Sequence, residues 1–131
     1  MALSHAFKRI RLNLARSKEF PEGSTRHGYE FIAPLDQTGH IDAHLWHQER
    51  ERCRVRRFWN GATEQIGQLV HKPGGVEHAR WVFDYDAERS DDDESGYRLG
   101  AHKFSPGEYV SISDDEGALH TFQVISVEPA S

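Results

Sequence analysis

The amino-acid sequence predicts a mainly β fold, an antiparallel barrel of about eight or nine strands with one short helix. Short runs of alternating or aromatic-rich residues are separated by turn residues every ~8–12 positions. The dipeptide Asn60-Gly61 lies between two such runs and is typical of a tight β-hairpin. Three Trp, seven Phe and four Tyr supply large side chains for a core. An antiparallel sandwich is the alternative, because it would show the same pattern.

The first two strands are predicted from alternation and from breaks in it. Residues 9–14 alternate between polar or charged and aliphatic side chains, which indicates a half-buried strand. Residues 18–26 combine proline, glycine and polar residues, and they predict a loop. A second strand is expected over 27–33, and Pro34 ends it because proline cannot donate to a ladder.

A change of period predicts the short helix. Between residues 41 and 50, larger side chains recur at spacings of three and four, and the composition favours a helix. Asp42 is placed to cap this helix, because its carboxylate can accept hydrogen bonds from the unpaired amides of the first turn. We therefore expect a helix over about 41–50.

The strongest structural signal is the hairpin around Asn60-Gly61. From residue 53 the period becomes two, and both turn residues tolerate positive φ in a two-residue loop. The pattern predicts that 52–59 pairs antiparallel with about 63–71. One face of the first strand would carry Cys53, Val55, Arg57 and Trp59, and the other would carry Arg54, Arg56 and Phe58.

The second half of the chain predicts strands at about 78–86, 97–104, 108–113 and 118–127, with turns at 72–75, 105–107 and 114–117. The acidic stretch at about 87–95 has almost no apolar side chain and predicts a mobile, solvated loop. The last strand changes its inward face between Val124 and Ile125. Such a change requires a bulge or burial on both sides.

Length and composition predict one cytoplasmic domain spanning residues 1–131. A chain of this length can bury roughly two-thirds of its surface around one core. No run approaches the roughly 20 apolar residues that cross a bilayer, and the first residues lack the apolar run of a secretory signal. The single cysteine, Cys53, cannot form an internal disulfide, which agrees with a reducing compartment. No membrane partner is expected.

An arginine row is the main candidate for ligand binding. On a strand, Arg52, Arg54 and Arg56 would project from one face, where they could grip phosphates, and Phe58 on that face could stack a base. This arrangement points to a nucleotide or nucleic acid. The formal net charge of −5 opposes such a partner, because it repels polyanions. In the simpler interpretation, the acidic segment 84–94 neutralises the arginines or both face water.

Nine histidines raise the question of zinc. On a helix, His44 and His47 would lie one turn apart, and the hairpin could bring His71 or His78 close to them. The spacing matches neither a zinc finger nor the His-Glu-x-x-His arrangement. The alternative is a set of ordinary imidazoles bonded to backbone and water.

No catalytic template is found in the sequence. It contains no phosphate-binding glycine loop and no nucleophile elbow, and Cys53 lies among strand residues. The sequence therefore favours a noncatalytic binding module that recognises a small molecule or a macromolecular partner through a barrel mouth or the arginine-bearing face. One alternative is a zinc-dependent or thiol enzyme built on the histidines and Cys53. Another is a homo-oligomer, such as a homodimer, that covers exposed aromatic faces at Trp46 and Trp59.

Overall fold

Among the residues that the structure describes, eight antiparallel strands pair in the order of the chain, and the last strand pairs with the first to close a barrel. The computed structural model describes residues 6–72, 80–85, 94–97, 103–113 and 118–130. In this part of the chain, α2 (Ala43–Gln48) and the 3-10 helix η1 (Arg50–Arg52) connect the second strand to the third. The predicted fold class is confirmed, and the closed ladder decides for the barrel. The strands are β1 (Phe7–Leu14), β2 (Ser24–Pro34), β3 (Arg54–Trp59), β4 (Gln65–Lys72), β5 (Arg80–Asp84), β6 (Glu94–Tyr97), β7 (Tyr109–Ser113) and β8 (Leu119–Pro129).

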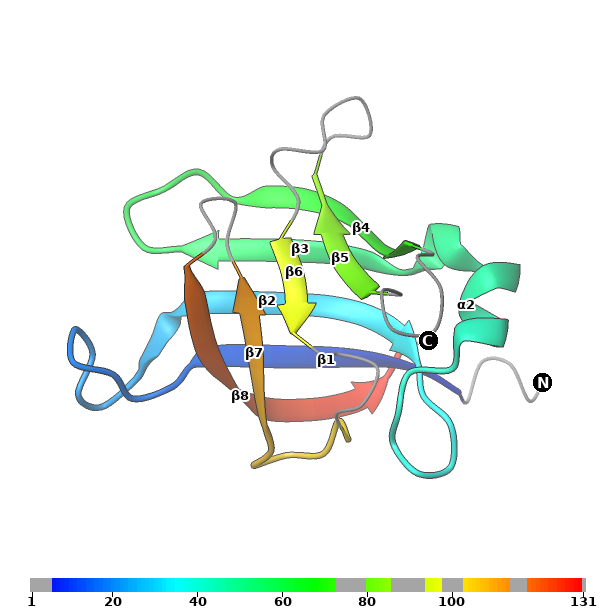
Figure 1. The fold of residues 1–131 in the computed structure, drawn as a ribbon, viewed down its shortest axis with the longest axis horizontal. Coiled ribbons are helices and arrows are strands. Elements are labelled where there is room, and N and C mark those ends of the chain that lie inside the picture. Colours follow the sequence, from blue (N-terminus) through cyan, green and yellow to red (C-terminus); the bar gives the residue numbers. More distant parts are fainter. Residues whose placement is uncertain (1–5, 73–79, 86–93, 98–102, 114–117, 131) are drawn as a thin grey trace.

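The helix and two of the hairpin loops lie at opposite ends of the barrel. In Figure 1, α2 is beside the carboxyl end of β2, whereas the loops that join β1 to β2 and β3 to β4 project at the other end. These loops comprise residues 15–23 and 60–64. The helix α2 therefore packs on one end of the barrel. The two loops lie at the other end, which we call the mouth of the barrel.

Aromatic side chains fill the barrel interior. The Tyr29 ring centroid lies 4.9 Å from that of Phe83 and 5.1 Å from that of Phe122. The Phe31 ring is 5.3 Å from Phe83 and 5.8 Å from Phe104. All five side chains are buried. Eight strands enclose roughly the space that such side chains fill, so the interior is a packed core.

The helix α2 is held at the barrel end by its cap and by one tryptophan. Asp42 caps the helix as predicted, because its carboxylate accepts a hydrogen bond of 3.1 Å from the Leu45 amide. The Trp46 indole donates to the Leu69 carbonyl at 2.9 Å and meets the Trp81 ring edge-on at 5.4 Å. Trp46 is therefore buried, and the prediction that it offers an exposed aromatic face was wrong.

The β3–β4 hairpin forms where predicted, but its loop is longer than two residues. The last paired residues are Arg57 and Gln65, so the ladder is centred on Gly61. A two-residue loop at Asn60-Gly61 would instead pair Trp59 with the residue after Gly61. Gly61 has φ of 86°, in the left-handed region that glycine tolerates. The turn residues were therefore correct, and the predicted loop length was wrong.

The predicted irregularity of the last strand is present. Arg11 pairs with Ser126, whereas the next residue, Leu12, pairs with Val124, which leaves Ile125 as the extra residue of a bulge. Ile125 is 43% exposed, and Val124 is buried. The bulge is therefore what lets β8 keep apolar residues against the core on both sides of the break.

The strand β6 differs from the sequence prediction. It spans Glu94–Tyr97 and pairs with β5 and β7, so the strand predicted at 97–104 begins earlier. Pairing with both neighbours outweighs the low local strand preference of these polar residues. The predicted acidic loop at 87–95 lies outside the described residues up to 93, and its last two positions belong to β6. Positions 73–75 and 114–117 of the other predicted turns also lie outside the described residues.

Candidate functional site

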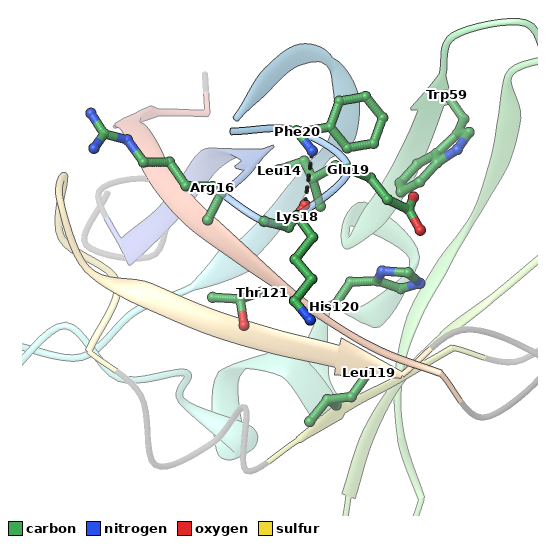
Figure 2. A pocket seen from close by; sticks show the side chains of 11 residues that line it. Leu14, Arg16, Lys18, Glu19, Phe20, Trp59, Leu119, His120 and Thr121 are labelled. Carbon is green, nitrogen blue, oxygen red and sulfur yellow. Dashed lines mark hydrogen bonds between the residues drawn. The ribbon is translucent and has the colours of Figure 1, made fainter. Parts of the chain in front are cut away.

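A pocket of about 290 Å³ opens at the end of the barrel opposite α2. We call it the mouth pocket. Its walls come from the β1–β2 loop, the end of β3 and the beginning of β8 (Figure 2). Three segments far apart in sequence thus meet here because β1 pairs with both β2 and β8, and β2 also pairs with β3. The lining residues used below are Arg16, Lys18, Glu19, Phe20, Trp59 and His120.

Aromatic rings form one wall of the mouth pocket and its support. Trp59 and His27 are opposite each other in the β2–β3 ladder, and their ring centroids are 4.6 Å apart. Phe20 packs on His27 at 4.8 Å, and His120 lies 6.0 Å from Trp59. The loop holds Phe20 in place, since the Phe20 amide donates to the Ser17 hydroxyl at 3.1 Å (Figure 2). The wall is therefore fixed by strand register and a loop turn.

His27 supports this wall as a neutral ring. It is buried, and its Nδ1 lies 2.6 Å from the Ser24 hydroxyl. Burial lowers the pKa of His27, and the nearby Arg57 charge lowers it further. The Arg57 guanidinium carbon lies 4.4 Å from the centroid of the Trp59 ring. Positive charge therefore adjoins the aromatic wall from Arg57 and not from His27 at neutral pH.

The open side of the mouth pocket carries charged side chains. Arg16, Lys18 and Glu19 are exposed, and none of them forms an ion pair with another described residue. In Figure 2, the Lys18 side chain points across the pocket toward His120. Two cations and one carboxylate therefore line the entrance, and the cations have their charge available for a ligand.

Arg52 does not belong to the predicted arginine row. It lies in η1 and not in a strand, so the prediction that it shares a strand face with Arg54 was wrong. Its guanidinium lies 4.5 Å from the Phe7 ring centroid and 3.4 Å from the Glu49 carboxylate. The helical turn after α2 delays the start of β3 to Arg54, which removes one arginine from the row.

Arg54, Arg56 and Phe58 do lie on the outer face of β3, but two of them are engaged locally. Arg56 pairs with Glu64 at 2.8 Å and with Glu30 at 3.7 Å. The Phe58 ring has the Arg56 guanidinium at 5.2 Å and the Arg11 guanidinium at 4.5 Å. Glutamates on neighbouring strands therefore compensate Arg56, and the ring of Phe58 is already in contact with two cations.

The predicted zinc residues differ in exposure and in their ring contacts. His44 and His47 are exposed on α2, whereas His71 stacks on Trp81 with ring centroids 4.3 Å apart. His78 lies outside the described residues. Among the residues that the structure describes, no three histidine, cysteine or acidic side chains are grouped to hold a metal ion. Zinc binding through His44 and His47 together with His71 or His78 remains a prediction.

Cys53 lies directly before β3 and is buried. Its burial bears on the alternative that the protein is a thiol enzyme. Its side chain is 0% exposed, and burial raises the pKa of the thiol from 9.0 to about 12. We expect native Cys53 to react with iodoacetamide at pH 8 about 1000-fold more slowly than an unfolded thiol, since each pKa unit changes the thiolate fraction tenfold. Mass spectrometry of native and urea-unfolded protein measures this ratio. Equal rates would contradict the buried, protonated thiol.

Sequence patterns did not single out the mouth pocket residues Lys18, Phe20 and His120. Their only signal is their position next to strand ends, at 18–26 and at the start of the last strand. No family model matches the chain, and it matches no curated protein and no solved structure. Within the described residues, no helix has the length and apolar character needed to span a bilayer.

Proposed function

We propose that this protein is a noncatalytic binding module whose mouth pocket takes a small, planar aromatic anion. The observation that carries the proposal is the pairing of an aromatic wall with unpaired cations around one hollow. Phe20 and Trp59 supply the wall, and Lys18 and Arg16 supply the charge. A planar aromatic ligand would stack on the wall, and its anionic group would accept a charge-assisted hydrogen bond from Lys18 or Arg16.

The size of the mouth pocket supports a small ligand. Its volume of about 290 Å³ is near the lower end of ligand pockets in proteins. The barrel interior is filled by Tyr29, Phe31 and Phe83, so a ligand would lie at the mouth above the core. The pocket combines an aromatic wall with two cations and one carboxylate at its entrance, and the cations would orient a planar ligand by its anionic end.

Titration with 2-naphthoate tests the proposal. In ¹H–¹⁵N spectra of the full chain, we expect the Trp59 indole resonance and the Phe20 and His120 amides to shift. Neutral 2-naphthamide should bind about tenfold more weakly, because it lacks the charge that Lys18 and Arg16 attract. Equal affinity for both compounds, or shifts confined to other residues, would overturn the proposal.

Three charge variants separate a specific site from general attraction. Lys18→Gln is expected to weaken 2-naphthoate binding about tenfold, which corresponds to about 1.4 kcal/mol. Glu19→Gln should strengthen binding severalfold, because it removes the carboxylate at the entrance. Lys103→Gln is the matched control, since Lys103 is exposed beside Gly39 and does not line the mouth pocket. A loss in Lys103→Gln equal to that in Lys18→Gln would indicate non-specific charge effects.

A further inference from the structure

A second hollow lies on the outer face of the barrel, away from the mouth pocket. It has a volume of about 340 Å³ and crosses β1 to β4. We call it the outer groove. Register places its side chains together, because Arg9 is opposite Ile32 and Arg56 is opposite both Glu30 and Ile66. Opposite residues in antiparallel strands share a face, so these side chains share the outer surface.

The charges around the outer groove are unequally compensated. Glu30 lies 3.9 Å from Arg11 and 3.7 Å from Arg56, so its carboxylate already serves two arginines. Arg9 and Arg54 are exposed, and neither forms an ion pair with a described residue. Glu128 is opposite Arg9 on β8 without forming an ion pair with it. Two guanidinium groups thus remain available at the edge of the groove.

Apolar side chains line the groove on both sides of the strand that carries Arg54. Ile32 is half-buried on β2, between the strands that carry Arg9 and Arg54. Ile66 on β4 is 46% exposed, although it occupies a strand that has neighbours on both sides. Arg54 and Ile66 also line an adjoining hollow of about 300 Å³, whose other side chains include apolar Val70 and the polar groups of Gln68 and Asp84. The surface therefore combines cationic groups with an exposed apolar strip.

We propose that the outer groove binds a free alkyl carboxylate of medium chain length. A guanidinium binds a carboxylate through two parallel N–H donors, and Arg54 is placed to do so with Arg9 adding charge from across Ile32. The alkyl chain would lie along Ile32 and Ile66, which removes their apolar surface from water. Charge complementarity selects the anion, and the isoleucines select an apolar tail.

Titration with octanoate below its micelle-forming concentration tests this proposal in the full chain. We expect the amides of Ile32, Arg54 and Ile66 to shift and those of Phe20 and Trp59 to stay unchanged. Octan-1-ol should bind at least about fivefold more weakly, because its hydroxyl lacks the negative charge and the second acceptor oxygen of a carboxylate, and octyltrimethylammonium should bind more weakly still, because a guanidinium repels its positive charge. Equal binding by the three compounds, or shifts confined to the mouth pocket, would overturn the proposal.

Two variants test which side chains of the outer groove bind octanoate. Arg54→Gln is expected to weaken octanoate binding about tenfold, and Ile66→Ser severalfold, whereas Arg50→Gln on η1 serves as the control. Anionic vesicles and an acidic peptide are the competing partners. If either binds this face more tightly than octanoate and loses affinity in Arg54→Gln, the assignment to a free alkyl carboxylate is wrong. Unchanged octanoate affinity in both groove variants would also contradict it.

Discussion

Gly28→Ala is expected to destabilise the barrel by about 3 kcal/mol or more, because there is no room for a side chain at this position. A Cβ atom built on Gly28 would lie 1.9 Å from the Leu12 carbonyl oxygen and 3.1 Å from the Phe58 Cζ. The closer contact is with backbone. The β1 backbone cannot move away freely, because β1 is paired with β2 on one side and β8 on the other. The chain backbones approach closely here, and only glycine fits.

Urea unfolding followed by circular dichroism measures this loss. Gly61→Asn is the matched control, because Gly61 has open space around it and asparagine tolerates its positive φ, so a cost below about 1 kcal/mol is expected. Truncating the Phe58 ring in a Gly28→Ala/Phe58→Ala double variant should not restore stability, since the main clash is with the Leu12 backbone. A stability of Gly28→Ala within 1 kcal/mol of the parent would contradict this close approach.

The parts of the fold that follow from local periodicity were predictable from sequence. Alternation over residues 9–14 and 53–59 reports a strand with two different faces, and both strands form with those faces. The bulge at Ile125 was also predictable, because a change of parity in an apolar strand requires an extra residue. The β3–β4 loop length was not, since register also depends on pairing with strands distant in sequence.

The candidate sites depend on long-range pairing, which single-sequence patterns do not report. Phe20, Trp59 and His120 line one pocket because β3 pairs with β2 and barrel closure sets β8 beside β1. The arginine row assumed a strand through Arg52, but the turn of η1 continues to that residue. Compensation of Arg56 by Glu30 likewise required the β2–β3 register. Local pattern therefore located the strands, whereas tertiary contacts determined which charges are available.

Phe83→Ala is expected to cost about 3–5 kcal/mol of unfolding free energy, a large part of the total for a small protein. Phe83 is 1% exposed, and its ring contacts both Tyr29 and Phe31 in the centre of the barrel. Removing the ring leaves a cavity that strands on every side prevent from closing. The midpoint of guanidinium unfolding should therefore fall, with an unchanged slope if unfolding stays two-state.

The Phe83→Ala variant also tests whether the ligand binds in the barrel core or in the mouth pocket. Phe83 does not line that pocket, so folded Phe83→Ala should bind 2-naphthoate with an affinity within about twofold of the parent. Phe83→Leu keeps most of the volume and should cost less than about 1.5 kcal/mol. A small cost for Phe83→Ala would contradict a filled interior and would reopen the barrel centre as a ligand site. A large cost with intact binding would place recognition at the mouth, where Phe20 and Trp59 face the entrance above a closed core.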